Sequence, residues 1–133
     1  MSKAAMEGIA KRASSKALGD AAEALALAHL CAHGLQLVRR NYRLARGPHA
    51  HAGEVDLILR ERDGTLVFVE VRQRRGLQHG GAAASVGAAK QRRIILAAQH
   101  FLLGLATVPP CRFDVVAIDG AQVQWLRAAF DAA

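Results

Sequence analysis

Residues 53–75 read GEVDLILRERDGTLVFVEVRQRR, two apolar, strand-like runs joined by an Asp-Gly pair. Such a pair between apolar runs is a strong β-hairpin signal. The runs also carry carboxylates where core-facing strands normally carry Val or Ile: Glu54 and Asp56 on the first, Glu70 on the second. Like charges that face each other across strands destabilise a sheet unless something compensates for them. The register of the hairpin therefore decides what these carboxylates do.

Two registers are possible, and they exclude each other because a slip of one residue moves every side chain to the other face. A two-residue turn would put Asp56 and Glu70 on opposite faces as separate buried charges. A three-residue loop with Gly64 in the left-handed conformation pairs Glu61 with Thr65 and sets Asp56 opposite Glu70. We favour the second register, in which the two Cβ atoms lie about 5 Å apart. Two carboxylates at that spacing can share a divalent cation, and oxygen ligands favour Mg²⁺ or Mn²⁺.

A purely structural explanation of the same carboxylates stays open. In it, Glu54 pairs with Arg72 across the two strands, and Asp56 caps a neighbouring turn. The hairpin by itself does not decide between this explanation and a metal site.

The whole chain predicts one α/β domain. Its 133 residues, 52% of them hydrophobic, suffice for a single core. Residues 1–13 are interpreted as a flexible basic tail and residues 14–133 as the domain. The expected elements are a helix from Ser14 or Ser15 to His33, closed by Gly34; strands at 35–43, 55–60 and 66–74; a helix from Val86 to Leu103, capped by Ser85; and strands at 112–118 and 123–126. The order αβββαββ, with a long connection before residue 112, predicts a parallel crossover and a mixed sheet flanked by helices.

Charge favours a polyanionic partner. Eighteen Lys and Arg against eleven Asp and Glu give a net charge of +7, which suits nucleic acid or an anionic membrane. A high genomic GC content, which enriches Arg and Ala, is the competing explanation. Seven basic residues are candidates for contacts with phosphates, although each could equally be a solvated surface charge: Arg39, Arg40, Arg43, Arg74, Arg75, Lys90 and Arg93.

Membrane and secreted classes are not favoured. The N-terminus has no apolar segment typical of a secretory signal, and no stretch reaches the ~18 apolar residues of a membrane span. Two cysteines are too few for a disulfide framework. We therefore expect a cytoplasmic protein with no membrane partner.

A helical Glu23 comes first, Asp56 follows on a strand, and Glu70-Val71-Arg72 lies on the next strand. In this pattern of acidic residues, the chain resembles the core of PD-(D/E)XK nucleases. More closely, the chain resembles the YraN family of bacterial proteins. The pairing of GEVDLI with FVEVR at this separation is highly specific, and the similarity covers nearly everything after residue 14. The matching segments are GDAAEALALAHL (19–30), GEVDLIL (53–59), VFVEVRQRR (67–75), GGAAASVGAAKQRR (80–93), CRFDVVAI (111–118) and WLRAAF (125–130).

The resemblance implies a restriction-endonuclease-like fold, akin to Holliday-junction resolvases, with a Mg²⁺ or Mn²⁺ site. Asp56, Glu70 and Glu23 would be the acidic ligands or their supports, and the backbone carbonyl of Val71 would complete the ligand set. Arg72 stands at the position of the motif lysine. The implied activity is metal-dependent hydrolysis of phosphodiester bonds in DNA, with branched DNA as a candidate substrate. Because junction resolvases act as dimers, a homodimer is a further expectation, although the sequence indicates no dimer surface.

The arginine at position 72 departs from the motif. Arginine cannot act as a base, since its pKa exceeds about 12, but it can donate two hydrogen bonds to phosphate oxygens. Three functions therefore remain open: an active Mg²⁺-dependent endonuclease or structure-selective DNA-processing protein, a catalytically impaired nucleic-acid-binding protein with the nuclease fold, and a protein-interaction module whose charge is incidental.

Other polar residues give weaker indications of function. The pairs His49/His51 and His29/His33 have no third ligand nearby in the sequence, so we assign them no metal site. Asp114 is interpreted as a support for the end of the sheet or a partner for an arginine. Phe68, Phe113 and Trp125 lie in apolar runs and are expected in the core, which argues against base stacking.

Overall fold

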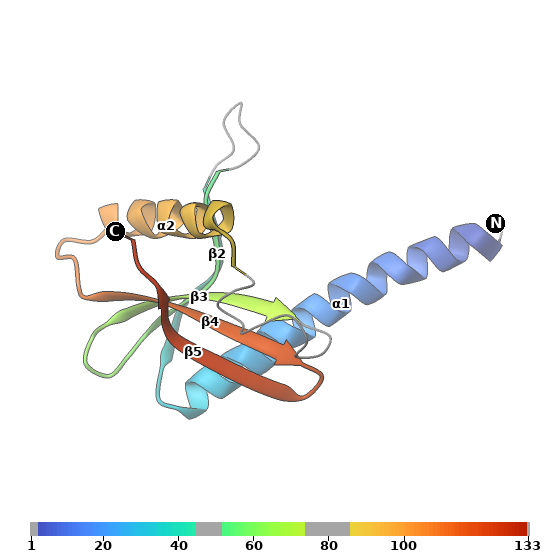
Figure 1. Cartoon of the computed structure of the whole chain (residues 1–133), viewed down its shortest axis with the longest axis horizontal. Helices are drawn as coiled ribbons and strands as arrows, with labels where there is room; N and C mark the ends of the chain where they lie inside the picture. The colour runs from blue at the N-terminus through green and yellow to red at the C-terminus, as the bar shows by residue number, and fades with distance from the viewer. Residues whose placement is uncertain (1–2, 45–51, 74–85, 133) are drawn as a thin grey trace.

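The computed structural model describes residues 3–44, 52–73 and 86–132, with side chains described from residue 16 onward. Two helices and five strands follow one another in the predicted order αβββαββ (Figure 1). They are α1 (Lys3–Ala32), β1 (Gln36–Arg43), β2 (Glu54–Arg60), β3 (Leu66–Gln73), α2 (Ala88–Leu103), β4 (Cys111–Asp119) and β5 (Gln122–Phe130). The predicted single α/β domain with a restriction-endonuclease-like order of elements is confirmed.

Helix α1 is longer than the sequence predicted. It begins at Lys3 and extends well beyond the sheet (Figure 1), so the predicted start at Ser14 or Ser15 is wrong. The Ala, Lys, Glu and Met residues of this segment are strong helix formers, and they outweigh the weak cap signal at Ser14. The predicted end is confirmed. Gly34 has φ +93°, and the Leu35 N–H donates to the Leu30 carbonyl at 3.2 Å, which closes the helix in a Schellman motif.

The five strands form one mixed sheet in the order β1-β2-β3-β4-β5. Strands β3 and β4 are parallel and are joined through α2, as the crossover prediction required, whereas the other three pairs are antiparallel. Strand β5 runs from Gln122 to Phe130 and is therefore longer than the predicted strand at 123–126.

The helices cover opposite faces of the sheet. Helix α1 packs on an apolar cluster that includes Leu57, Val69 and Val116, and α2 packs on a second cluster that includes Ile58, Phe68 and Phe113 (Figure 1). The sheet is therefore the middle layer of three. Phe68 and Phe113 are buried, as predicted, while Trp125 is partly buried beside the α1 cluster.

Helix α2 begins at Ala88, two residues later than expected, with Gly87 at its N-cap and no side-chain cap. The predicted cap, Ser85, lies outside the described residues. The Gln91 side chain instead donates to the Val86 carbonyl at 2.9 Å, which secures the entry to the helix. In the described part of the chain, no helix has the length and apolar character needed to cross a membrane.

Candidate active site

The hairpin adopts the three-residue register that sets Asp56 opposite Glu70. The Glu61 N–H donates to the Thr65 carbonyl at 2.9 Å, and Gly64 has φ +94°. The paired residues run from Arg60↔Leu66 to Leu57↔Val69, and the next position on each strand is Asp56 and Glu70. The register prediction, on which the shared acidic site depends, is confirmed.

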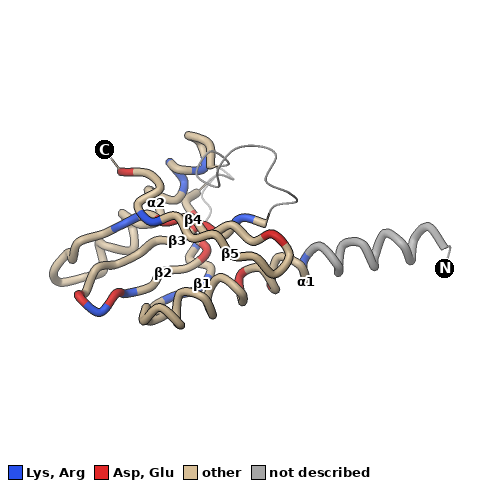
Figure 2. The backbone as a smooth tube through the Cα atoms, turned by 60° about the horizontal axis from the view of Figure 1, so that its bottom comes forward, with Lys and Arg blue, Asp and Glu red and all other residues tan. Residues whose placement is uncertain are grey.

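Charged positions of this hairpin lie at its two ends, the turn and the end that carries Asp56 and Glu70, with an uncharged stretch between them (Figure 2). At the acidic end the strands separate. The Val71 N–H donates to Asp56 Oδ2 at 2.8 Å, so a side chain takes the place of a backbone acceptor. The Asp56 carboxylate is thereby fixed between the two strands.

A break in the strand alternation accompanies this separation. Ile58 and Val55 both pack under α2, although they are three residues apart, and Leu57 packs under α1. On β1, Asn41 lies between the residues paired with Leu57 and Val55 and has φ +50°, a left-handed conformation that Asn tolerates. Both strands therefore depart from regular geometry at the level of Asp56, beside the point where the β2–β3 pairing ends.

Glu70 is the buried acid of the site. It is only 3% exposed, and its Oε2 atom has no hydrogen-bond partner among the described residues. Burial, followed by the negative charge of Asp56, raises the pKa of Glu70 to about 8. Burial also raises the pKa of Asp56, although the Val71 hydrogen bond opposes that shift. The charge of Asp56 thus disfavours ionisation of the buried Glu70 beside it, and a cation between the two carboxyls would relieve that repulsion.

A lysine from α2 enters the same site. Lys90 Nζ lies 2.6 Å from Glu54 Oε1 and 3.6 Å from Glu70 Oε1, and the Lys90 side chain is 17% exposed. The hydrogen bond from Lys90 is the main reason that the pKa of Glu54 is lowered. Glu54 also lies 3.8 Å from the Arg43 guanidinium. The ion pair that the structural alternative assigned to Arg72 is thus made by Lys90 and Arg43.

Glu23 approaches from α1. Its side chain is half-buried, and its pKa is raised by burial and then by the charge of Asp56, while Arg40 and Arg43 lower it. Glu23 therefore lies close enough to Asp56 to feel its charge, and its role at the acidic pair stays a prediction. No group of three His, Cys, Asp or Glu side chains converges closely enough to hold a metal ion within residues 16–44, 52–73 and 86–132. The centre is a pair of carboxylates, with Glu23 at its margin.

Arg72, the residue at the motif-lysine position, lies on the same strand two residues beyond Glu70. Its Nη1 atom is 3.9 Å from Glu70 Oε1, and its side chain is 36% exposed. Val71 contributes its N–H to Asp56, while its carbonyl stays a predicted metal ligand. Arg72 therefore contacts the acidic pair from the rim of the site, whereas Lys90 contacts it from inside.

The residues present fit a hard divalent cation in one respect and depart from the expected set in another. Asp56 and Glu70 face each other and offer carboxylate oxygens as metal ligands. The buried Glu70 Oε2 atom accepts no hydrogen bond from a described residue. With Glu23 outside direct reach, water would have to supply more of the ligands, as is usual for Mg²⁺.

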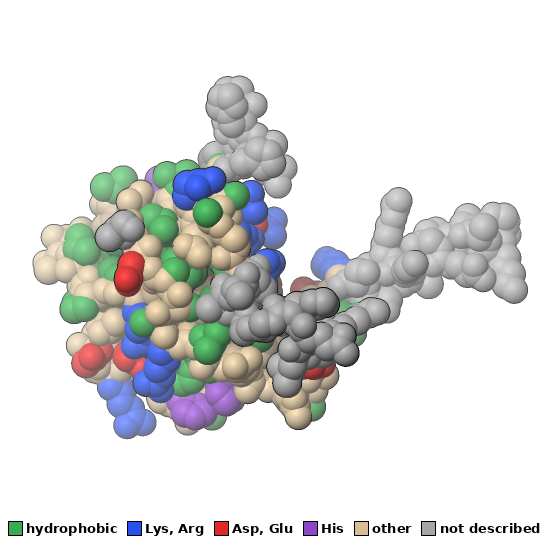
Figure 3. All heavy atoms as spheres, viewed as in Figure 1, with side chains coloured by type: hydrophobic (Ala, Val, Ile, Leu, Met, Phe, Trp, Pro, Cys, Tyr) green, Lys and Arg blue, Asp and Glu red, His purple; other side chains and the backbone are tan. Residues whose placement is uncertain are grey.

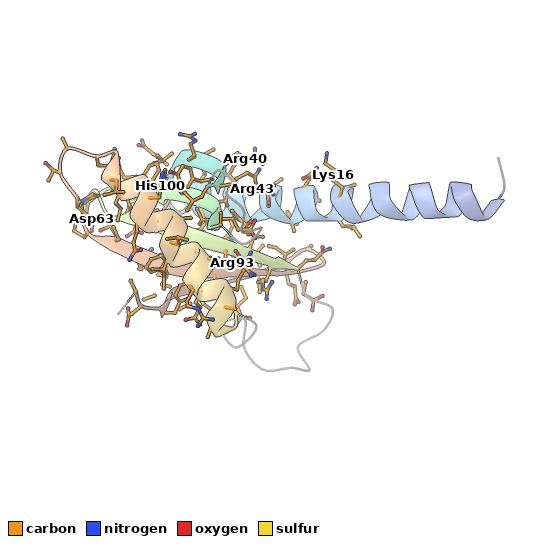
Figure 4. All side chains as sticks on the ribbon, turned by 90° about the horizontal axis from the view of Figure 1, so that it is seen from above. Lys16, Arg40, Arg43, Asp63, Arg93 and His100 are labelled. Atoms are coloured by element: carbon orange, nitrogen blue, oxygen red, sulfur yellow. The ribbon has the colours of Figure 1, made fainter. Side chains whose placement is uncertain are left out.

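Several basic residues lie near the acids of the site, since Arg40 and Arg43 lower the pKa of Glu23, and Arg43 and Arg93 contribute to lowering that of Glu54. Lys16 of α1 and Arg40 and Arg43 of β1 lie along one side of the molecule, Arg93 projects from α2, and Asp63 of the hairpin turn lies at the far end (Figure 4). On the face seen in Figure 3, basic side chains form separate groups, one beside α2 and one at the opposite edge. Arg39 instead stacks over the Tyr42 ring at 5.5 Å. Arg74, Arg75, His49 and His51 lie outside the described residues.

The position of Lys90 is what the sequence interpretation missed. Lys90 was expected among the surface residues that contact phosphates, but it continues the buried stripe of Ile94, Ala97 and Ala98. Those spacings of four, seven and eight residues mark one face of a helix. A lysine on the core-facing stripe needs a buried partner, and that signal is readable in the sequence.

Asp114 belongs to a separate, structural network. It is fully buried and accepts hydrogen bonds from Arg112, from the Trp125 indole N–H at 2.9 Å and from the Ala128 N–H at 2.9 Å. Arg112 also donates to Glu61 at 2.9 Å. Both predicted roles of Asp114, support of the sheet and binding of an arginine, therefore agree with the structure. His29 and His33 stack near Trp125 and bring no third metal ligand among the described residues.

Comparison with known proteins assigns the family. The profile of the uncharacterised protein family UPF0102 matches residues 22–118. The chain belongs to the UPF0102, or YraN, family. A UPF0102 protein of Methylibium petroleiphilum is 62% identical over 89% of this chain and 97% of its own length. One from Acidovorax sp. (strain JS42) is 59% identical over 96% of the chain and 95% of its own length. Another, from Verminephrobacter eiseniae, is 63% identical over 86% of the chain and 78% of its own length.

Proposed function

We propose that this UPF0102 protein is a metal-dependent nuclease that hydrolyses phosphodiester bonds in DNA in the cytoplasm. The observation that carries the proposal is the convergence of Asp56 and Glu70 from adjacent antiparallel strands, with one buried oxygen of Glu70 left without a donor. A purely structural pair of acids would be expected to have its oxygens satisfied. In this pair, one buried carboxylate oxygen has no hydrogen-bond partner among the described residues, and a cation would satisfy it.

Asp56 and Glu70 would hold Mg²⁺ or Mn²⁺, which supplies Lewis-acid activation of water and neutralises charge on the phosphate. The protein's own residues do the remaining work. The Val71 N–H fixes the orientation of the Asp56 carboxylate. Glu23, whose pKa is raised by burial and by the charge of Asp56, is placed to hold a water beside the centre. Arg72 can clamp a phosphate oxygen from the rim.

The basic residues around the centre support a nucleic-acid substrate. Arg40 and Arg43 are both close enough to Glu23 to lower its pKa, so a phosphate backbone that they bind would pass beside the acidic pair. Each phosphate neutralised adds about 0.9 to the slope of log K against log salt for duplex DNA. Branched DNA is the first substrate to test, and a homodimer would present two such centres to one junction.

The direct test is cleavage of linear, nicked and four-way DNA with Mg²⁺, Mn²⁺ or no metal. We expect metal-dependent cleavage that falls by roughly two orders of magnitude or more in Asp56→Asn and Glu70→Gln, with circular dichroism showing that both variants fold. Asp131→Asn makes the same carboxylate-to-amide change at an exposed position and should cleave like the wild type. Equal cleavage by all four proteins would place the activity in another site or in a contaminant.

A second candidate is a nucleic-acid-binding protein that keeps the fold without the chemistry. Arg72 at the motif-lysine position and the lack of three converging metal ligands in the described side chains favour it. This candidate predicts binding to DNA that weakens steeply with salt, without cleavage under any metal. Arg43→Gln should then reduce the salt slope by about 1. DNA binding that is absent or insensitive to salt would contradict both candidates and favour a protein-interaction module.

A further inference from the structure

Lys90 occupies the interior of the acidic centre. Its ammonium lies between Glu54, at 2.6 Å, and Glu70, at 3.6 Å. It comes from the first turn of α2, and its side chain is about half as exposed as that of Arg72 (17% against 36%). A lysine in this position is a point charge with three donors, two of which can be directed at carboxylates while one remains.

The packing of α2 on β2 fixes this position. Gly53 precedes β2 and lies so close to α2 that a Cβ atom there would be 2.6 Å from the Ala97 nitrogen and 2.7 Å from the Arg93 carbonyl oxygen. The same contact brings the start of β2 against α2, where Glu54, the next residue, meets Lys90. Lys90 is therefore held by a rigid backbone contact as well as by an ion pair.

Glu54 is a partner that does not depend on the acidic pair. A divalent cation held by Asp56 and Glu70 would take over the charge of Glu70 and weaken the 3.6 Å contact with Lys90. The 2.6 Å contact with Glu54 would remain. The ammonium would then stay beside the centre with a donor free for a phosphate oxygen or a water, which is the task of the motif lysine.

We propose that Lys90, positioned by Glu54, supplies the ammonium group of this active site, in place of a lysine at position 72. The inference rests on the proposed nuclease function and assigns the cationic role within it. Arg72 then serves as a supporting contact with substrate at the rim. Lys90 is a catalytic residue in this account because it touches the reacting phosphate or water, and Glu54 is a positioning residue.

The test compares Lys90→Ala with Arg92→Ala, an exposed basic residue on the same helix, and with Arg72→Ala. Alanine preserves the helix, and thermal unfolding checks the fold. For Lys90→Ala we expect a loss of roughly 100-fold or more in cleavage rate, with DNA affinity changed less than threefold, and partial rescue by added ethylammonium. Arg92→Ala should cleave like the wild type and Arg72→Ala within about tenfold of it; a structural role for Lys90 predicts no rescue by the amine.

A second readout does not depend on cleavage. Calorimetric titration with Mn²⁺ should show binding to Lys90→Ala that is several-fold tighter than to the wild type, because a positive charge near the ligands has been removed. Glu54→Gln should lower the cleavage rate less than Lys90→Ala does, and it serves as the deciding variant if Lys90→Ala fails to fold.

The outcomes separate the two proposals. If the wild type cleaves DNA and Lys90→Ala cleaves equally well, the inference about Lys90 is wrong and the nuclease proposal stands. The inference is also wrong if Lys90→Ala is impaired but Mn²⁺ binds it no more tightly and the amine restores nothing. If the wild type cleaves no DNA with any metal, the nuclease proposal fails and the assignment of Lys90 fails with it.

Discussion

Two buried carboxylates on neighbouring strands of the same sheet differ in how they are satisfied. Asp114 on β4 is fully buried and accepts four hydrogen bonds, two from Arg112, one from Trp125 and one from the Ala128 backbone. Glu70 on β3 is 3% exposed, lies opposite another acid and has an oxygen without a donor. The first arrangement stabilises the fold, whereas the second leaves an unmet demand for positive charge. The extent of burial does not distinguish Asp114 from Glu70. The hydrogen-bond donors around each carboxylate do.

The largest expected effect is on the satisfied acid. Asp114→Asn keeps the shape but turns an acceptor into a donor facing other donors, so it should reduce the free energy of unfolding by about 3–5 kcal/mol. Urea unfolding followed by the fluorescence of Trp125, the only tryptophan, measures this change. A cost below about 1 kcal/mol would mean that the Asp114 network contributes little and that the contrast with Glu70 is overstated.

Gly53→Ala should reduce the free energy of unfolding by about 1–3 kcal/mol, because the new Cβ atom would lie 2.6 Å from the backbone of α2. The strain falls on the acidic centre and not on the Asp114 network. Mn²⁺ affinity should therefore drop while the fluorescence of folded Trp125 is unchanged. Gly19→Ala, at a helical site with no atom within 4 Å, is the matched control and should stabilise the protein slightly. Equal costs at both glycines would contradict the close contact.

Glu70→Gln should increase the free energy of unfolding at high pH, whereas Asp114→Asn should reduce it. The pKa of Glu70 is raised to about 8 in the fold, above its ordinary value near 4.5, so the folded state binds the proton more tightly. Stability of the metal-free protein is then highest below about pH 4.5 and declines as the pH rises toward 8. The glutamine variant should be more stable than the wild type by roughly 1–3 kcal/mol at pH 9 and nearly equal to it at pH 4.5. Denaturation curves at the two pH values, recorded with chelator, check this; destabilisation at both would contradict it.

The smallest effect is expected at Glu54, whose pKa is lowered by its hydrogen bond to Lys90. A lowered pKa contributes stability that is present above the ordinary value and is lost as the pH falls through the folded value. Glu54→Gln should therefore cost about 0.5–1 kcal/mol at pH 7, a small figure because the Glu54 side chain is 38% exposed. The cost should shrink as the pH falls below 4.5. Opposite pH dependences for Glu54 and Glu70, measured side by side, would sharpen the distinction between a satisfied acid and one with an oxygen left over.

Local sequence predicted the part of the site that local physics controls. The Asp-Gly turn, with Gly64 at φ +94°, sets the register, and the register sets Asp56 opposite Glu70. Gly34 ended α1 where expected, because few residues other than glycine adopt its conformation without strain. The predicted start of α1 was wrong, because a cap signal at Ser14 is weak compared with a run of good helix formers.

The order of the elements, the hairpin and the two facing acids could be predicted from the chain alone, since each depends on residues close together along it. How those acids are compensated depends on the packing of the whole domain. Lys90 of α2 is 36 residues from Glu54, and Arg112, which binds Asp114, is 51 residues from its second partner, Glu61. Such distant pairs form only when the elements of the domain have packed together, because the energy of a buried charge depends on every group around it.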